Sequence, residues 1–181
     1  MSMDFKEKDL ENIIYQNTLS EEGRKKLEER GLSINGKVFR QLNLAGYGRL
    51  DLMTVYKRYD CLEITIYELK EGKVNTNTLL QACRYLTAVK QIIESKTNRE
   101  IYYRVVLLGR EVELNGDFAF LYNFLSFATI VTYEYTIEGI SFETIDKDFI
   151  KGESKLNPDD YRLSMDDMRK IIELGDTELP F

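Results

Sequence analysis

The spacing of apolar residues changes from a helical period to a strand period and back along the chain. The first 30 residues repeat with the 3.6-residue period of amphipathic helices, with Asp4 and Ser20 as the expected N-caps. From Lys37 to Lys70 the period falls to two, as in half-buried strands joined by short links, which favours an antiparallel meander. The predicted elements are helices over residues 4–16 and 20–30 and strands over 38–44, 49–56 and 62–70.

After Lys70 the helical period returns. The predicted elements are a helix over residues 78–94, a strand over 101–108, a helix over 118–124 capped by Asp117, and a hairpin of 128–136 with 140–145. The strand over 101–108 is apolar on both faces, as at the centre of a sheet covered on each side, so the long helix before it is a crossover. A breaker at Asn157-Pro158 and a capping pair, Ser164 with Asp167, predict a final helix.

This order predicts an α+β fold, an α/β/α sandwich around a mixed central sheet, closed by the C-terminal hairpin and the final helix. The length of 181 residues suits one domain with a large core. We expect that domain in residues 1–150, and an acidic tail with a short helix in residues 151–181.

The amino-acid composition limits the kinds of catalytic site that the chain can form. The chain has no histidine, which removes the common neutral-pH base and the Ser-His-Asp and Cys-His nucleophile systems. Catalysis would have to use carboxylates, Lys, Tyr or a hard metal ion. Cys61 and Cys83 show no paired spacing, so we expect reduced, structural thiols. The charged start MSMDFKEKDL is unlike a signal peptide and no run is long enough to span a membrane, so a cytoplasmic protein without membrane contact is expected.

The formal net charge of −6 is unevenly distributed. Residues 37–110 hold 13 Lys and Arg against seven Asp and Glu, a net charge of +6. A local surface that faces phosphate is compatible with this block, although chance blocks of this size are common. The aromatic residues between 102 and 142 lie in an acidic region, which favours core packing, or a dimer face, over base stacking.

Three charged residues interrupt the predicted strands. If the turn between the second and third strands is centred on residues 59 and 60, Asp51 lies opposite Glu68, and Lys70 shares the face of Glu68 two residues on. Two close carboxylates repel each other, which Lys70 and a divalent ion could offset. Oxygen ligands favour Mg²⁺, Mn²⁺ or Ca²⁺ over softer metals. The competing interpretation is a cross-strand salt bridge on a wet sheet face.

The strings GRLDL, IYELK and LLQACRYL, in this order, resemble the PD-(D/E)XK nuclease superfamily, which has a restriction-endonuclease-like fold. Glu68-Leu69-Lys70 matches the E-x-K motif, and Asp51 matches the acidic position before it, although Leu50 stands where the eponymous Pro would be. Gln81 and Tyr85 are similar to the Q-x-x-x-Y feature of several branches. The predicted α-β-β-β-α-β order is that of the superfamily core.

The resemblance implies a catalytic set of Asp51, Glu68, Lys70, Gln81 and Glu11. It implies Mg²⁺, with Mn²⁺ as a substitute, held by Asp51, Glu68, the backbone carbonyl of Leu69 and, through water, Glu11. Glu7 competes with Glu11 for this first-helix role. Tyr85, Arg49 and Arg84 are candidate substrate contacts, and the two arginines could equally be surface cations.

We therefore expect a Mg²⁺-dependent deoxyribonuclease that hydrolyses DNA phosphodiester bonds in defence, repair or mobile-element biology. The alternative is a catalytically inactive nuclease-like module that binds nucleic acid or protein through a partner. A structural protein with an accidental motif is a third interpretation. Because no separate reader domain is evident, a homodimer or a protein partner is expected.

Overall fold

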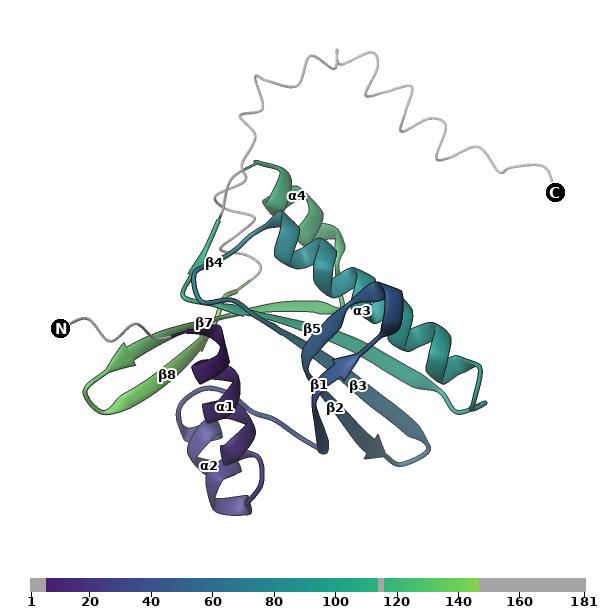
Figure 1. The fold of residues 1–181 in the computed structure, drawn as a ribbon, viewed down its shortest axis with the longest axis horizontal. Helices are drawn as coiled ribbons and strands as arrows, with labels where there is room; N and C mark the ends of the chain where they lie inside the picture. The colour runs from purple at the N-terminus through teal and green to yellow at the C-terminus, as the bar shows by residue number, and fades with distance from the viewer. Residues whose placement is uncertain (1–5, 114–115, 147–181) are drawn as a thin grey trace, which may run out of the picture.

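The computed structural model of the chain describes residues 6–113 and 116–146 (Figure 1). These residues form a mixed α+β fold around a six-stranded sheet. The helices are α1 (Glu7–Asn17), α2 (Glu21–Glu29), α3 (Thr76–Glu94) and α4 (Gly116–Phe124). The strands of the main sheet are β1 (Lys37–Asn43), β2 (Arg49–Arg58), β3 (Cys61–Leu69), β5 (Ile101–Gly109), β7 (Ala128–Thr136) and β8 (Gly139–Thr144).

The main sheet has the strand order β1-β2-β3-β5-β7-β8. Its centre is parallel, because β5 pairs in parallel with both β3 and β7, and its two flanks are antiparallel hairpins. The parallel step from β3 to β5 requires a crossover, which α3 supplies as predicted. The expected meander, crossover helix and closing hairpin are confirmed.

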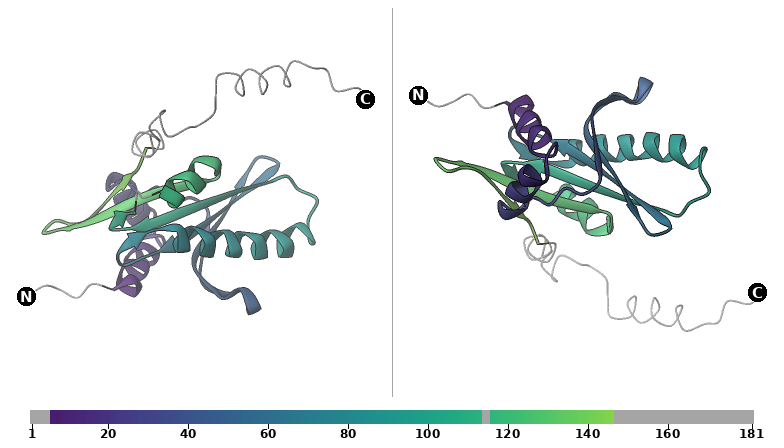
Figure 2. Two further views of the ribbon diagram at one scale, coloured as in Figure 1. Left: turned by 90° about the horizontal axis from the view of Figure 1, so that it is seen from above. Right: turned by 90° about the horizontal axis from the view of Figure 1, so that it is seen from below.

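Helices cover both faces of this sheet. On one face, the apolar side chains of α3 and α4, among them Leu79, Phe118 and Tyr122, pack on Ile66 and Leu107. On the other face, Leu10 and Ile14 of α1 and Leu27 of α2 pack on Leu69 and Leu108. Figure 2 shows α3 running along the sheet while the α1–α2 pair lies at one end of it. The predicted layering of helices around a sheet is confirmed.

Several predicted boundaries were wrong by one to three residues. The first helix begins at Glu7, because Asp9 accepts the Lys6 N–H (3.0 Å), which makes Lys6 the N-cap in place of Asp4. Helix α3 begins at Thr76, because Asn75 caps it by accepting the Thr78 N–H. Asp117 lies in the first turn of α4 and does not precede it. The predicted cap Ser20 is confirmed, because it accepts the Gly23 N–H.

Two features have no counterpart in the predicted elements. Short strands β4 (Lys73–Val74) and β6 (Glu111–Val112) form a separate parallel pair. The turn expected at residues 45–48 between β1 and β2 is present, and its 3₁₀ conformation, η1 (Ala45–Tyr47), was not predicted. The predicted tail, with Asn157, Pro158, Ser164 and Asp167, lies outside the described residues. Cys61 and Cys83 are free thiols.

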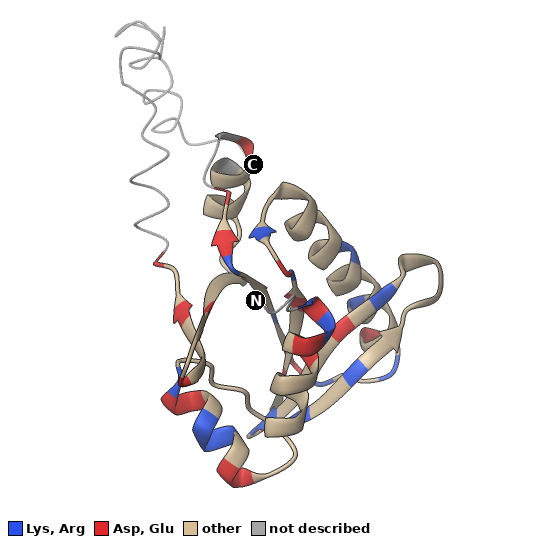
Figure 3. Ribbon diagram, turned by 60° about the vertical axis from the view of Figure 1, so that its left-hand side comes forward, with Lys and Arg blue, Asp and Glu red and all other residues tan. Residues whose placement is uncertain are grey.

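The cations of residues 37–110 are spread over several elements and interspersed with acidic positions (Figure 3). The positive block of the sequence is therefore divided among strands β1, β2, β4 and β5, helix α3 and the loops between these elements. None of the described helices combines the length and apolar character that crossing a membrane requires.

Candidate active site

The register of the central hairpin brings the predicted acidic pair together. Strands β2 and β3 pair from Arg58 opposite Cys61 to Leu52 opposite Tyr67, which is the predicted register. The ladder ends at that pair; the same register continued by one step would place Asp51 opposite Glu68, and the Asp51 side chain accepts the N–H of the next residue, Leu69. The two-residue turn of Tyr59 and Asp60 sets this register, and a slip by one residue would send Asp51 to the other face.

Glu68 is fully buried near the end of β3. It shares a sheet face with Ile64 and Ile66, so its carboxylate lies against an apolar background. Lys70 Nζ donates to Glu68 Oε1 at 2.6 Å. Among the described residues, Glu68 Oε2 has no hydrogen-bond partner. A buried carboxylate oxygen without a partner is costly, and a cation at this position would remove the cost.

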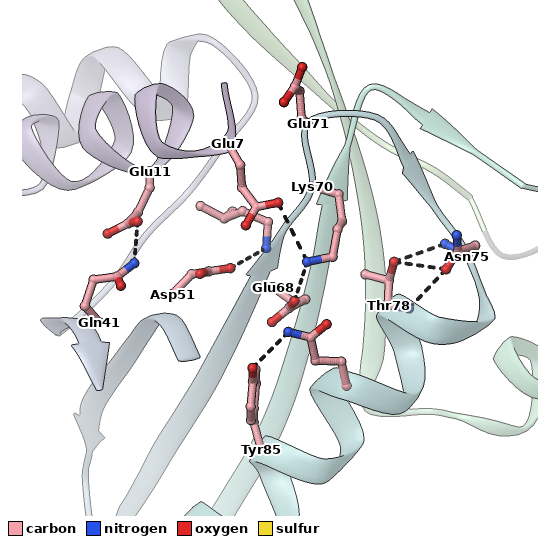
Figure 4. A network of polar contacts seen from close by, with 12 residues as sticks. Glu7, Glu11, Gln41, Asp51, Glu68, Lys70, Glu71, Asn75, Thr78 and Tyr85 are labelled. Carbon is pink, nitrogen blue, oxygen red and sulfur yellow. Dashed lines mark hydrogen bonds and ion pairs between the residues drawn. The ribbon is translucent and has the colours of Figure 1, made fainter. Parts of the chain in front are cut away.

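Asp51, in β2, is held by the backbone of the neighbouring strand β3. Its Oδ2 accepts the Leu69 N–H at 3.0 Å, which fixes the carboxylate beside the Glu68-Leu69-Lys70 segment. Glu7 approaches from α1, with its Oε2 at 3.7 Å from Lys70 Nζ. Figure 4 shows these side chains converging from β2, β3 and α1. Three carboxylates therefore surround one ammonium group.

Burial changes the protonation of this cluster. Desolvation raises the pKa of Glu68 to about 7, although the hydrogen bond and the charge of Lys70 oppose the shift. Desolvation also raises the pKa of Asp51 to about 6, against the Leu69 N–H, and Glu7 adds repulsion. Burial by itself would lower the pKa of Lys70, but the hydrogen bond to Glu68 and the charges of Glu68, Glu7 and Asp51 raise it. The lysine therefore stays charged, while the carboxylates carry an unbalanced negative charge near neutral pH.

Gln81 and Tyr85 lie together on α3. The Gln81 amide donates to the Tyr85 hydroxyl at 2.8 Å, as expected for positions four apart on one flank. Tyr85 is 4% exposed, and its ring lies against Gly48, where an added Cβ would be 3.3 Å from Cε1. Tyr85 therefore orients Gln81, which is the member of the pair that reaches the site.

Glu11 is buried on α1, and its carboxylate is bound at both oxygens. Arg40 Nε forms an ion pair with Oε1, and the Gln41 amide donates to Oε2. Glu7 and Glu11 are one helical turn apart on the same flank of α1. Glu7 forms an ion pair with Lys70, whereas Glu11 contacts Arg40 and Gln41 of β1 (Figure 4).

An open hollow of about 590 Å³ lies between α1, the β1–β2 hairpin and α3. The residues that line it are Glu7, Lys8, Glu11, Arg40, Gln41, Arg49, Asp51 and Gln81. Arg49 is exposed at its mouth, as a substrate contact would be. Arg84 is exposed on α3 and does not line this hollow.

The sequence interpretation missed three contributors to the site. Arg40 and Gln41 are consecutive polar residues in β1, so the only signal was a break in strand alternation. Tyr133 of β7 donates its hydroxyl to the carbonyls of Lys70 (3.3 Å) and Glu71 (2.9 Å), which holds the chain directly after the E-x-K segment. Nothing in the sequence near Tyr133 indicates this contact.

The oxygen atoms at this site could hold one hard divalent ion, with water supplying the remaining ligands. Asp51 and Glu68 supply two carboxylates, and one of their oxygens is buried without a partner. In the described part of the chain, no three His, Cys, Asp or Glu side chains are grouped closely enough to hold a metal ion by themselves. Two carboxylates, a backbone carbonyl and several waters make up the kind of site that Mg²⁺ accepts.

The chain has no significant match among protein-family models, curated proteins or solved structures. The case for function therefore depends on the geometry of the site.

Proposed function

We propose that the protein is a divalent-metal-dependent nuclease of the PD-(D/E)XK superfamily that hydrolyses DNA phosphodiester bonds. The observation that supports this most is the buried Glu68 Oε2 without a partner, beside a charged Lys70 and opposite Asp51. A salt bridge on a wet sheet face would leave neither carboxylate buried. The restriction-endonuclease-like order of α1, β1 to β3, α3 and β5 supports the same proposal.

In this proposal Asp51, Glu68 and the Leu69 carbonyl hold Mg²⁺. The N–H and C=O of one extended residue point to the same side of a strand, and the Leu69 N–H already faces Asp51. When bound, Mg²⁺ supplies the positive charge that activates water and offsets charge on the phosphate.

Lys70 has two tasks in the proposed reaction. Its ammonium orients the attacking water, and it stabilises the negative charge that develops on the phosphate oxygens. The ion pair with Glu68 and the contact with Glu7 keep Nζ at the site and keep it protonated. Gln81 adds amide groups that can hydrogen-bond the water or the phosphate, with Tyr85 behind it.

The alternative function is a catalytically inactive nuclease-like module. One observation favours it: both oxygens of Glu11, the first-helix carboxylate that the resemblance implies, already accept from Arg40 and Gln41, which draw the group toward β1 and reduce what it can offer the water shell of a metal ion. Such a module would bind nucleic acid or protein without cutting.

Cleavage and metal binding separate the two functions. Supercoiled, linear and single-stranded DNA are incubated with Mg²⁺ or Mn²⁺ and either the wild type, Lys70→Ala or Asp51→Asn. The wild type should cut at least one substrate, and each variant should lose at least about 100-fold in rate, as for the loss of one electrostatic group. Matched controls are Lys73→Ala, an exposed lysine paired with Glu111, and Asp60→Asn in the hairpin turn.

The controls should cut like the wild type. Calorimetry should show that Mg²⁺ binding is weakened in Asp51→Asn and retained in Lys73→Ala. Metal binding without cleavage of any substrate would favour the inactive module. Cleavage that survives Lys70→Ala would show that the site is assigned to the wrong residues.

A further inference from the structure

The Arg40 side chain is held from three directions. Its Nε forms the ion pair with Glu11, its Nη1 lies 3.4 Å from Asn12 Oδ1, and its guanidinium carbon lies 5.2 Å from the centre of the Tyr15 ring. All three partners belong to α1, whereas Arg40 belongs to β1. A guanidinium that is already fixed loses little side-chain entropy when it binds a ligand.

The backbone of β1 is distorted next to this arginine. Neighbouring strand residues normally point to opposite faces of a sheet. Gln41 has a φ of 53°, in the left-handed region, and its side chain joins that of Arg40 at the Glu11 carboxylate. The left-handed conformation is unfavourable for a residue with a Cβ, because the Cβ lies too close to the following carbonyl oxygen. The strain supports the view that the arrangement around Arg40 serves a function.

Arg40 retains donors for a ligand. Within the described residues, its Nη2 has no hydrogen-bond acceptor, and its side chain is 26% exposed. It lines the same hollow as Asp51, the proposed metal ligand, and Arg49. The planar fork of a guanidinium matches the oxygens of a phosphate group.

We propose that Arg40 binds a phosphate of the nucleic-acid strand next to the one that is cut, and that Glu11, Asn12 and Tyr15 position it. This inference rests on the proposed nuclease function, because it takes the metal site as the place of cleavage. Glu11 then acts on the substrate through Arg40, which explains why both of its oxygens are bound by protein groups.

A structural role for Arg40 predicts something different. If Arg40 only neutralised the buried Glu11, its loss would destabilise the protein through an unpaired buried charge. Removing the charges of both Glu11 and Arg40 would then restore the stability of the protein, and with it the affinity for DNA. A phosphate contact would not be restored by the double change Glu11→Gln/Arg40→Gln, because the guanidinium is still missing.

The test measures binding to oligonucleotides that carry one neutral methylphosphonate linkage at each position in turn. Single-stranded and duplex 20-residue DNA are titrated by fluorescence anisotropy with Mg²⁺ in a Lys70→Ala background, which keeps the strand intact. Three proteins are compared: this background, the background with Glu11→Gln, and the background with Glu11→Gln/Arg40→Gln. Thermal unfolding establishes that all three are folded.

With Arg40 present, one neutral linkage should weaken binding about tenfold. Without Arg40, the same linkage should have less than about a twofold effect, while the fully charged DNA binds about tenfold more weakly than it does to the background protein. Arg58→Gln, which removes an exposed cation at the far end of β2, should leave the tenfold effect unchanged.

Equal effects of every linkage with and without Arg40 would overturn the assignment, as would recovery of full affinity in the double variant. The proposed nuclease function fails separately, when the wild type cuts no DNA. The binding comparison still reports on Arg40 in that case, because it does not depend on cleavage.

Discussion

At the scale of single residues, the protonation of Glu68 determines what the site can bind. A carboxylate whose pKa is raised to about 7 by burial is partly neutral at the pH of the cell unless a cation takes the place of the proton. A divalent ion at the proposed site would compete with protons for the same oxygens, so calorimetric titrations should show metal affinity rising as the pH increases from 6 to 8.

The stability of the metal-free protein should depend on pH in the opposite sense. Because the folded-state pKa of Glu68 lies above the ordinary value of 4.5 for a glutamate, the native state binds more protons than the unfolded state between those two values. The contribution of Glu68 to stability is then greatest below pH 4.5 and is lost as the pH rises toward about 7, by at most about 1.4 kcal/mol per pH unit. Urea unfolding with EDTA at pH 5, 6, 7 and 8 measures this slope.

Glu68→Gln should flatten the slope, because the amide does not titrate. Part of the slope should remain, since the pKa of Asp51 is also raised, to about 6. Glu63→Gln on the same strand is the control for placing an amide in β3. A slope as steep in Glu68→Gln as in the wild type would show that Glu68 does not carry the linkage.

Three of the site residues could be located from sequence because their geometry is local. A tight hairpin fixes the register, and the register places Asp51, Glu68 and Lys70 within a few ångströms. The contacts of Glu11 could not be located in this way, because Arg40 is 29 positions away and reaches it across the packing of α1 on β1. No residue pattern in the sequence predicts that Gln41 adopts the left-handed backbone conformation.

At the scale of elements, the end of α2 depends on a glycine. Gly31 has a φ of 96°, and a Cβ added there would lie 2.1 Å from the Phe142 carbonyl oxygen of β8. Directly before it, the Arg30 carbonyl accepts the Phe142 N–H at 2.7 Å, and the Arg30 guanidinium donates to the carbonyls of Glu138 and Ile140. The α2 C-terminus and β8 are therefore joined through their backbones.

Gly31→Ala should destabilise the protein by about 2 kcal/mol or more, because left-handed strain adds to a clash with backbone that cannot move away. Gly46→Ala, in the 3₁₀ turn, is the matched control, since an added Cβ there meets no atom within 4 Å. Its effect should stay within about 0.5 kcal/mol. Equal losses in chemical denaturation would mean that the α2–β8 junction does not contribute to stability.

The regular elements were predictable because each has a strong period or a strong cap. The crossover helix was found from its apolar stripe and the core strand from its two apolar faces. Strands β4 and β6 were not found, because two residues are too few to show a period. Their pairing depends on the close approach of Gly109 to Gly72, a tertiary contact with no local signal.

At the scale of the whole molecule, a net charge of −6 limits how nucleic acid can bind. Three cations, Lys8, Arg40 and Arg49, line the hollow at the site. If each meets one phosphate, log Kd should change with log salt concentration with a slope of about 2.7 on duplex DNA and about 2 on a single strand.

Anisotropy titrations between 50 and 300 mM KCl would measure this slope. Arg49→Gln should lower it by about one unit, whereas Arg58→Gln should leave it unchanged. A slope near zero would show that the hollow does not bind a charged backbone.

The two outer strands of the main sheet determine how copies of the chain could associate. On β8 the Ile140 carbonyl accepts from the Arg30 guanidinium and the Phe142 N–H donates to the Arg30 carbonyl. Strand β1 is interrupted by the left-handed Gln41 at the fifth of its seven residues. Neither border offers an unbroken row of backbone groups, which intermolecular strand pairing and amyloid-like stacking both require. A dimer of this protein would therefore have to form through side chains of its helices and loops, and the sheet itself resists aggregation.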